Sequence, residues 1–178
     1  MASLVRSPFA FFFFIIFLFS VFISTTNSHK ERQTHLHFFM HDTVSGPNAT
    51  AIKIIPSSGN AADIKFGHMT MIDDLLTEGP NLRTKIVGRA QGFYAVASLS
   101  EPALLLTMNL VFTEGKHNGS TLAVVSRDAI LSPVRELPVV GGTGRFRLAR
   151  GYALMKTYWY NVTSGDAILE LDVYVLHH

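Results

Sequence analysis

Apolar and polar residues alternate along most of the chain after Ser28, and no segment there keeps the period of an amphipathic helix. Runs rich in β-branched and aromatic residues recur instead, separated by Gly, Pro, Asn and Asp. The pattern predicts an all-β protein of eight or nine strands. The expected strands cover residues 35–42, 51–55, 66–72, 86–98, 104–112, 121–128, 134–139, 146–159 and 167–176.

The turns indicate how these strands are connected. Within Leu110–Val125, Asn118 and Gly119 tolerate a positive φ between two apolar arms, which predicts an antiparallel hairpin. The glycine-rich run Gly141–Gly144 is followed by neither Lys-Ser/Thr nor a helix, so we expect a tight turn and not a phosphate-binding loop. Short strands that each bury one face must hide their edges, which favours a small antiparallel barrel.

The N-terminal segment has a different pattern. Arg6 precedes the apolar run Phe9–Ile23, and the small polar residues Ser24–Ser28 follow it. This is the layout of a secretory signal peptide. The alternative is a membrane anchor, but the run falls short of the ~20 apolar residues that a spanning helix needs. We therefore expect residues 1–28 to be cleaved and residues 29–178 to form one secreted domain in the extracellular space.

Composition narrows the classes of function. Fifteen Lys and Arg against 13 Asp and Glu give a net charge of +2, which provides no electrostatic footprint for nucleic acid. The chain has no cysteine, so the core, closure of the sheet or assembly must hold the domain. Glycosylation motifs at Asn48, Asn118 and Asn161 agree with secretion and predict a glycoprotein.

Strand alternation identifies a candidate acid. Leu36, Phe38 and Met40 share one face of their strand, and Asp42 has the same parity. A carboxyl group at the mouth of an apolar barrel loses hydration, so its pKa rises and it can act as a general acid. The alternative is that the strand ends at Met40 and Asp42 caps the following turn.

A second pair of charged residues has the parity of an apolar face. Arg135 aligns with Leu137 and Val139, and Asp128 aligns with Leu122 and Val124. The two side chains could pair across neighbouring strands, in a catalytic or a purely structural role. By contrast, Asp73, Asp74 and Glu78 are expected to be solvated charges in a polar loop.

Other residues carry weaker signals. His35 and His37, with His41 nearby, share a strand face, but no cysteine or neighbouring carboxylate completes a ligand set, so no metal site is predicted. Tyr94 and Tyr152 could stack on an aromatic ligand, although strand aromatics usually pack in the core. No Gly-x-Ser-x-Gly motif and no cysteine nucleophile are present, which argues against covalent hydrolase chemistry.

Several longer motifs resemble the dirigent proteins of plants, from about Thr34 to the C-terminus. They are Phe39–Asn48, Phe66–Gly67, Asp73–Asp74, Thr77–Pro80, Val87–Tyr94, Phe112–Gly115, Asn118–Thr121, Val134–Gly144 and Ala149–Tyr152. The resemblance implies an eight-stranded antiparallel β-barrel, a homotrimer, and a lumen that binds phenolic intermediates without a cofactor. It also implies a role in phenylpropanoid metabolism and plant defence in the apoplast, with no membrane association of the mature form.

The resemblance also assigns site residues. Asp42, Asp128 and Arg135 match the family's pocket carboxylates and arginine, through His-Asp-Thr, Arg-Asp-Ala-Ile and Val-Arg-Glu. We predict them as the catalytic group, and the substrate-binding side chains as Phe38, Met40, Tyr94 and Tyr152. The implied activity is stereoselective coupling of monolignol radicals, such as those of coniferyl alcohol, that a separate laccase or peroxidase generates on the way to lignans such as pinoresinol.

One departure keeps two other functions open. Ser126–Pro133 is more similar to the branches of the family that include pterocarpan synthases than to lignan-forming members. In that alternative the barrel removes water from an isoflavanol, and a protonated Asp helps the hydroxyl group leave. A third possibility is a cell-wall binding module without turnover.

Overall fold

The computed structural model describes residues 30–55 and 65–178, and residues Glu31–His178 form one compact unit. The expected signal peptide lies outside the described residues. Within the described residues, no helix has the length and apolar character needed to cross a membrane.

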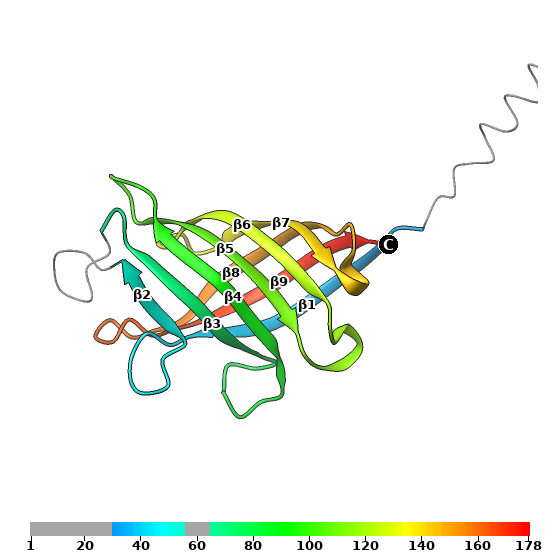
Figure 1. Cartoon of the computed structure of the whole chain (residues 1–178), viewed down its shortest axis with the longest axis horizontal. Coiled ribbons are helices and arrows are strands. Elements are labelled where there is room, and N and C mark those ends of the chain that lie inside the picture. Colours follow the sequence, from blue (N-terminus) through cyan, green and yellow to red (C-terminus); the bar gives the residue numbers. More distant parts are fainter. Residues whose placement is uncertain (1–29, 56–64) are drawn as a thin grey trace, which may run out of the picture. The chain divides into compact units, whose positions relative to one another are not determined.

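In the described part of the chain, nine antiparallel strands make up a single sheet (Figure 1). Their bounds are β1 Arg32–Asp42, β2 Ala51–Ile55, β3 Met69–Thr77, β4 Ile86–Val96, β5 Ala103–Phe112, β6 Thr121–Ala129, β7 Arg135–Thr143, β8 Arg150–Tyr160 and β9 Ala167–His177. Strands β3 to β9 pair in sequence order, and β9 pairs with β1 along its whole length.

The sheet closes on itself through β1 and β3. Phe39–His41 pair with Leu75–Thr77, which joins the two ends of the row of strands. The closed ring therefore contains eight strands, and the eight-stranded antiparallel barrel is confirmed. The short strand β2 pairs with the first half of β3, beside the closing segment.

The alternation read from the sequence places the core inside this ring. Phe38 and Met40 of β1 are buried, and Phe112 and Phe146 contact each other at the end of the barrel where β5 ends. Buried apolar side chains come from every strand of the ring. Closure of the sheet and this core hold a cysteine-free domain together, as expected for a barrel that leaves few free edges.

Two glycines allow β4 to approach its neighbour closely. A Cβ atom at Gly92 would lie 2.1 Å from the carbonyl oxygen of Thr107, and one at Gly88 would lie 2.0 Å from that of Val111. Any larger side chain would force β4 and β5 apart. The Gly-x-x-x-Gly spacing in β4 therefore allows the close approach of β4 to the backbone of β5.

Some predicted boundaries were wrong. β3 extends through Asp73 and Asp74 to Thr77, where a loop was expected. β7 runs through the glycine-rich segment to Thr143, and the chain turns only at Gly144, in a short 3₁₀ helix that buries Phe146. β8 accordingly starts at Arg150, four residues later than predicted.

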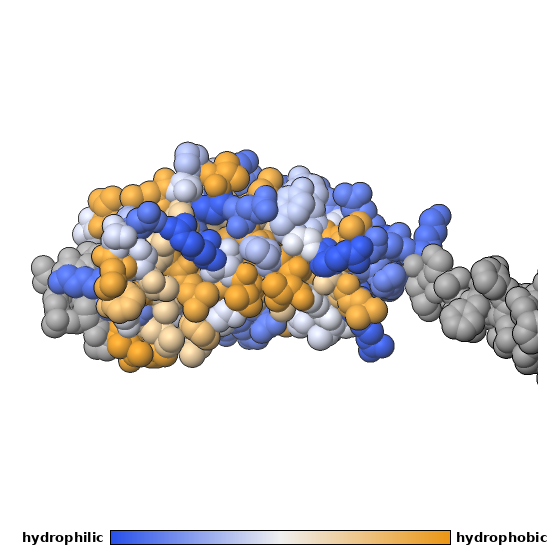
Figure 2. All heavy atoms as spheres, turned by 90° about the horizontal axis from the view of Figure 1, so that it is seen from above, coloured by the Kyte–Doolittle hydropathy of each residue, from blue (hydrophilic) through white to orange (hydrophobic). Residues whose placement is uncertain are grey.

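The outer surface carries apolar side chains among polar ones (Figure 2). Leu105, Val125 and Val140, on three successive strands, are exposed. Asn48 and Asn118, two of the predicted glycosylation sites, lie in exposed loop segments, and Asn161 is half-buried just after β8.

Candidate active site

Asp42 ends the inward-facing row of β1. Phe38 and Met40 precede it on the same face, and its own Oδ1 atom is buried without a hydrogen-bond partner. Burial, followed by the nearby charge of Asp166, raises the pKa of Asp42 to about 7, although a hydrogen bond from Tyr94 opposes the shift. At neutral pH this carboxyl group therefore holds a proton for a large part of the time.

Asp166, not Asp42, secures the turn after β1. Its carboxylate accepts hydrogen bonds from the backbone amides of Val44 and Ser45, at 2.8 and 3.1 Å, and from the hydroxyl of Ser45 at 2.7 Å. Partial burial works against ionisation, but hydrogen bonds from Ser164, Ser45 and these amides keep the pKa of Asp166 low. Asp166 thus caps the turn, which was the alternative role considered for Asp42. The carboxyl group of Asp42 is therefore available for chemistry.

A second buried carboxyl group, Asp74, lies beside Asp42. The sequence interpretation of Asp74 as a solvated loop residue was wrong, because Ile72, Asp74 and Leu76 alternate inward on β3. The hydroxyl of Thr50 donates a 2.5 Å hydrogen bond to Oδ1, and Oδ2 has no partner. Burial, and then the charge of Asp42, raises the pKa of Asp74 to about 8.

Together these two residues form an acidic pair. The charge of Asp42 contributes to the raised pKa of Asp74, and with pKa values of about 7 and about 8 the pair retains at least one proton near neutral pH. Burial and the charge of Asp42 raise the pKa of Tyr94, whose hydroxyl stays protonated and bonds to both Asp42 and Thr70. We call Asp42, Asp74 and Tyr94 the acid cluster.

The predicted pair of Asp128 and Arg135 is present. β6 and β7 pair from Thr121 to Val124, with a shift of register between Ala123 and Val124, and beyond that stretch Arg135 Nε lies 3.5 Å from Asp128 Oδ1. Both side chains are about 5% exposed, and burial raises the pKa of Asp128 despite the guanidinium beside it. Arg135 Nη2 has no hydrogen-bond partner, and Nη1 makes only a 3.4 Å contact with the carbonyl oxygen of Ile130.

The two groups lie toward the same end of the barrel, opposite the C-terminus (Figure 1). β1, β4 and β6 end there, and β7 begins there, which places Asp42, Tyr94, Asp128 and Arg135 near one rim. Among the described residues, no hydrogen bond or ion pair joins the acid cluster to the Asp128–Arg135 pair. A substrate could therefore contact both groups without having to break an existing link between them.

The two tyrosines predicted to bind substrate, Tyr94 and Tyr152, lie on different sides of the barrel wall. Tyr94 packs against the core and belongs to the acid cluster. Tyr152 is 40% exposed on the outer face, where its ring stacks on Tyr174 at 5.3 Å. Tyr152 thus does not share the interior with Phe38 and Met40, and its predicted place in the same substrate site is corrected.

A groove of about 620 Å³ lies at this rim. Its lining includes Asp42, the Pro80–Arg83 segment and the aromatic side chains of Tyr158 and Trp159. His41 also borders it, although alternation predicted this histidine on the outer face with His35 and His37. In the structure His41 is buried and shares a 2.7 Å hydrogen bond with Thr77, at the seam where β1 meets β3.

Known proteins are similar to this chain in sequence and in fold. A family model described as Dirigent-like protein matches residues 33–176. Dirigent protein 21 of Arabidopsis thaliana is 48% identical over 151 residues, which cover 84% of this chain and 80% of that protein. Pterocarpan synthase 1 of Glycine max is also 48% identical, over 84% of this chain and 81% of its own. The solved structure of a pterocarpan synthase dirigent protein superposes with a TM-score of 0.80 at 45% identity, covering 83% of this chain and 92% of that one.

Proposed function

This chain belongs to the dirigent-like proteins, and on that premise we propose that its barrel binds a phenolic substrate and removes water from an isoflavanol, in the manner of a pterocarpan synthase. The observation that carries the proposal is the acid cluster, with two buried carboxyl groups whose pKa values are raised to about 7 and about 8. Loss of a hydroxyl group as water requires a proton donor, and ordinary aspartates are ionised at neutral pH.

The proposed reaction proceeds in two steps that balance. Asp42 transfers its proton to the departing hydroxyl group as the carbon–oxygen bond breaks, and a conjugated phenol releases its proton to solvent, which gives a quinone methide and water. A second phenol of the substrate then attacks the electrophilic carbon, closing the ring. The proton of this second phenol passes to the Asp42 carboxylate, and the oxygen of the first phenol takes up a proton from solvent, so that Asp42 and Asp74 recover their starting state.

Arg135 and Asp128 have a complementary role in this proposal. The unpartnered Nη2 of Arg135 can donate a hydrogen bond to a phenol oxygen that gains negative charge when its proton leaves. Asp128 holds the guanidinium in place at 3.5 Å. The pair would therefore orient the phenol, while the acid cluster acts on the leaving group.

The alternative is control of radical coupling, in which a separate laccase or peroxidase oxidises a monolignol such as coniferyl alcohol. The similarity to Dirigent protein 21 equals that to the pterocarpan synthase, and the same donors could orient two radicals. A difference of about 1.4 kcal/mol between competing geometries gives tenfold selectivity, so two or three directional hydrogen bonds would suffice.

The groove at the rim favours a third candidate, binding to a cell-wall polymer without turnover. Tyr158 and Trp159 offer aromatic surfaces there, and Asn81 and Arg83 offer polar groups. A Trp159→Ala variant would lose retention on wall polysaccharide under this hypothesis. Because Asp42 lines the same groove, the dehydratase assay on this variant shows whether Trp159 also contacts the substrate.

A parallel assay separates these functions. Purified protein receives a hydroxy-isoflavanol without an oxidase and, separately, coniferyl alcohol with a laccase, and chiral chromatography follows the products. We expect loss of water and an enantiomerically enriched ring-closed product in the first assay. Enantiomeric excess that occurs only in the laccase assay would assign the radical-coupling function instead, and inactivity in both would favour the binding module.

A further inference from the structure

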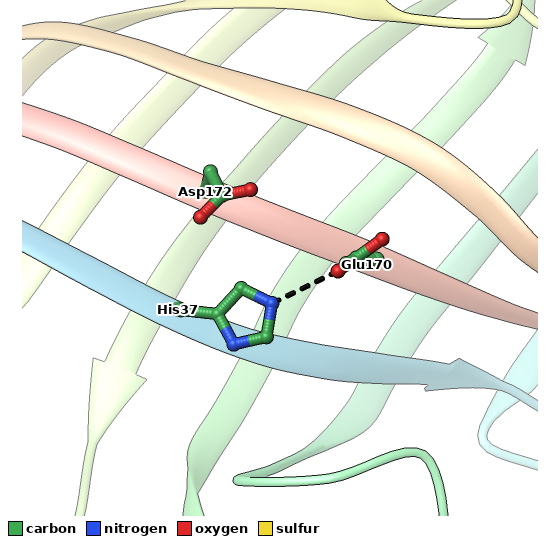
Figure 3. A group of neighbouring side chains, drawn as sticks. All are labelled: His37, Glu170 and Asp172. Carbon is green, nitrogen blue, oxygen red and sulfur yellow. Dashed lines mark hydrogen bonds and ion pairs between the residues drawn. The ribbon is translucent and has the colours of Figure 1, made fainter.

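The outer face of the barrel carries a cluster of metal-ligating side chains, far from the acid cluster. We propose that His37, Glu170 and Asp172 bind a zinc ion on this face, which ties β1 to β9. Their nearest ligand atoms, one from each residue, all lie within 4.8 Å of one another (Figure 3). Nothing in the proposed reaction uses these residues.

The pairing of β1 with β9 brings the ligands together. His37 lies directly opposite Asp172, and Glu170 is opposite Phe39, two residues further along β1. Alternation directs His37, Glu170 and Asp172 to the same side of the sheet. Glu170 is 133 residues from His37 in sequence, so the local pattern His-x-His could not reveal the carboxylates that complete the set.

The ligand atoms lie within 4.8 Å of one another. His37 Nε2 and Glu170 Oε1 share a 3.0 Å hydrogen bond, which a bound zinc ion would replace. Ligand atoms about 2.1 Å from a tetrahedral zinc ion are roughly 3.4 Å apart, so small side-chain rotations would close the remaining gap. Because all three residues are exposed or half-buried, water can supply the fourth ligand.

The donor set indicates which ion fits. One neutral imidazole and two carboxylates compensate the charge of a divalent cation, and nitrogen together with oxygen suits zinc better than calcium or magnesium, which prefer oxygen ligands alone. Lys156 of β8 is opposite Glu170 and is the cation that would compete for this carboxylate.

A further contact orients one ligand. His35 Nε2 lies 2.8 Å from Asp172 Oδ1, and the His35 ring stacks on Tyr174 at 4.4 Å. Hydrogen bonds to ligating carboxylates fix their direction and tune affinity for the metal. His35 is therefore a positioning residue of the proposed site, and its loss should weaken binding without abolishing it.

Calorimetric titration of the untagged protein with zinc chloride at pH 7.5 tests the proposal. We expect one zinc ion per chain, no detectable binding by His37→Gln, and at least tenfold weaker binding by Glu170→Gln. His178→Gln is the matched control, because it removes a histidine near the end of β9 and should leave the binding constant unchanged. Circular dichroism verifies that each variant is folded.

Thermal unfolding provides a second readout that does not depend on activity. A ligand at a hundredfold excess over its dissociation constant should raise the Tm of a domain of this size by about 5–10 °C. The wild type and His178→Gln should show this rise, and His37→Gln should not. Absence of binding at submillimolar zinc, or binding that His37→Gln leaves unchanged, would overturn the proposed site.

Discussion

Replacing Asp74 with Asn should make the protein more stable at neutral pH, although the side chain is completely buried in the barrel. The substitution keeps the shape of the side chain and its acceptor for the hydrogen bond from Thr50, and it removes the ionisable group. In the wild type, burial and the neighbouring Asp42 raise the pKa of Asp74 to about 8. The folded protein therefore keeps a proton that the unfolded chain releases near pH 4.

Proton linkage determines whether the stability of the wild type rises or falls with pH. Between about pH 4 and pH 8 the folded state binds more protons at Asp74 than the unfolded state, so the stability of the wild type falls as pH rises through this range. The slope is about 1.4 kcal/mol per pH unit while the difference is one full proton. Asn has no such dependence, so between pH 5 and pH 7 its advantage should grow by about 3 kcal/mol.

Urea unfolding at pH 5 and pH 7, followed by tryptophan fluorescence and circular dichroism, measures this effect. With a slope of about 2 kcal/mol per molar urea, the difference between the midpoints of variant and wild type should widen by about 1.5 M. Asp73→Asn is the matched control on the same strand, since Arg89 and Gln91 hold the pKa of this outward carboxylate low. An equal pH dependence of Asp74→Asn and wild type would refute the description of the acid cluster.

Three further predictions concern the site and the assembly. Asp42→Asn should lower kcat for dehydration by about 10²- to 10⁴-fold with little change in KM, as steady-state kinetics would show, because the amide cannot donate the proton of a carboxylic acid. Arg135→Gln should destabilise the fold by roughly 3–5 kcal/mol in chemical unfolding, since Asp128 would be left buried without its partner, and adding Asp128→Asn should restore most of the loss. The cysteine-free barrel should sediment as a trimer in analytical ultracentrifugation, and a monomer at micromolar concentration would contradict the assembly expected from the resemblance.

Much of the fold follows from strand alternation. The inward faces of β1 and β6 were predicted correctly because Phe38, Met40, Leu122 and Val124 repeat with a period of two. Boundaries were less accurate where polar residues continue a strand. Asp73 and Asp74 suggested a loop, but one faces Arg89 on the outer surface and the other is buried, so both fit a regular strand.

The site could be predicted only in part. Asp42, Asp128 and Arg135 were identifiable because each shares the parity of apolar neighbours. Asp74 has the same signal, between Ile72 and Leu76, and it was missed because adjacent acidic residues were taken as solvated. The partnership of Asp42 with Asp74 depends on closure of the barrel between β1 and β3, which no local pattern specifies.

The pH dependence of isoflavanol dehydration without an oxidase is the decisive measurement for the acid cluster. We expect the purified protein to accelerate loss of water, with a rate that is highest below about pH 7 and falls through about pH 8 as Asp42 and Asp74 lose their protons. The same fall should be absent from whatever slow reaction remains in a variant with Asn at both positions. A rate that stays constant up to pH 9, or no acceleration over buffer at any pH, would contradict the claim that the buried acid pair drives the reaction.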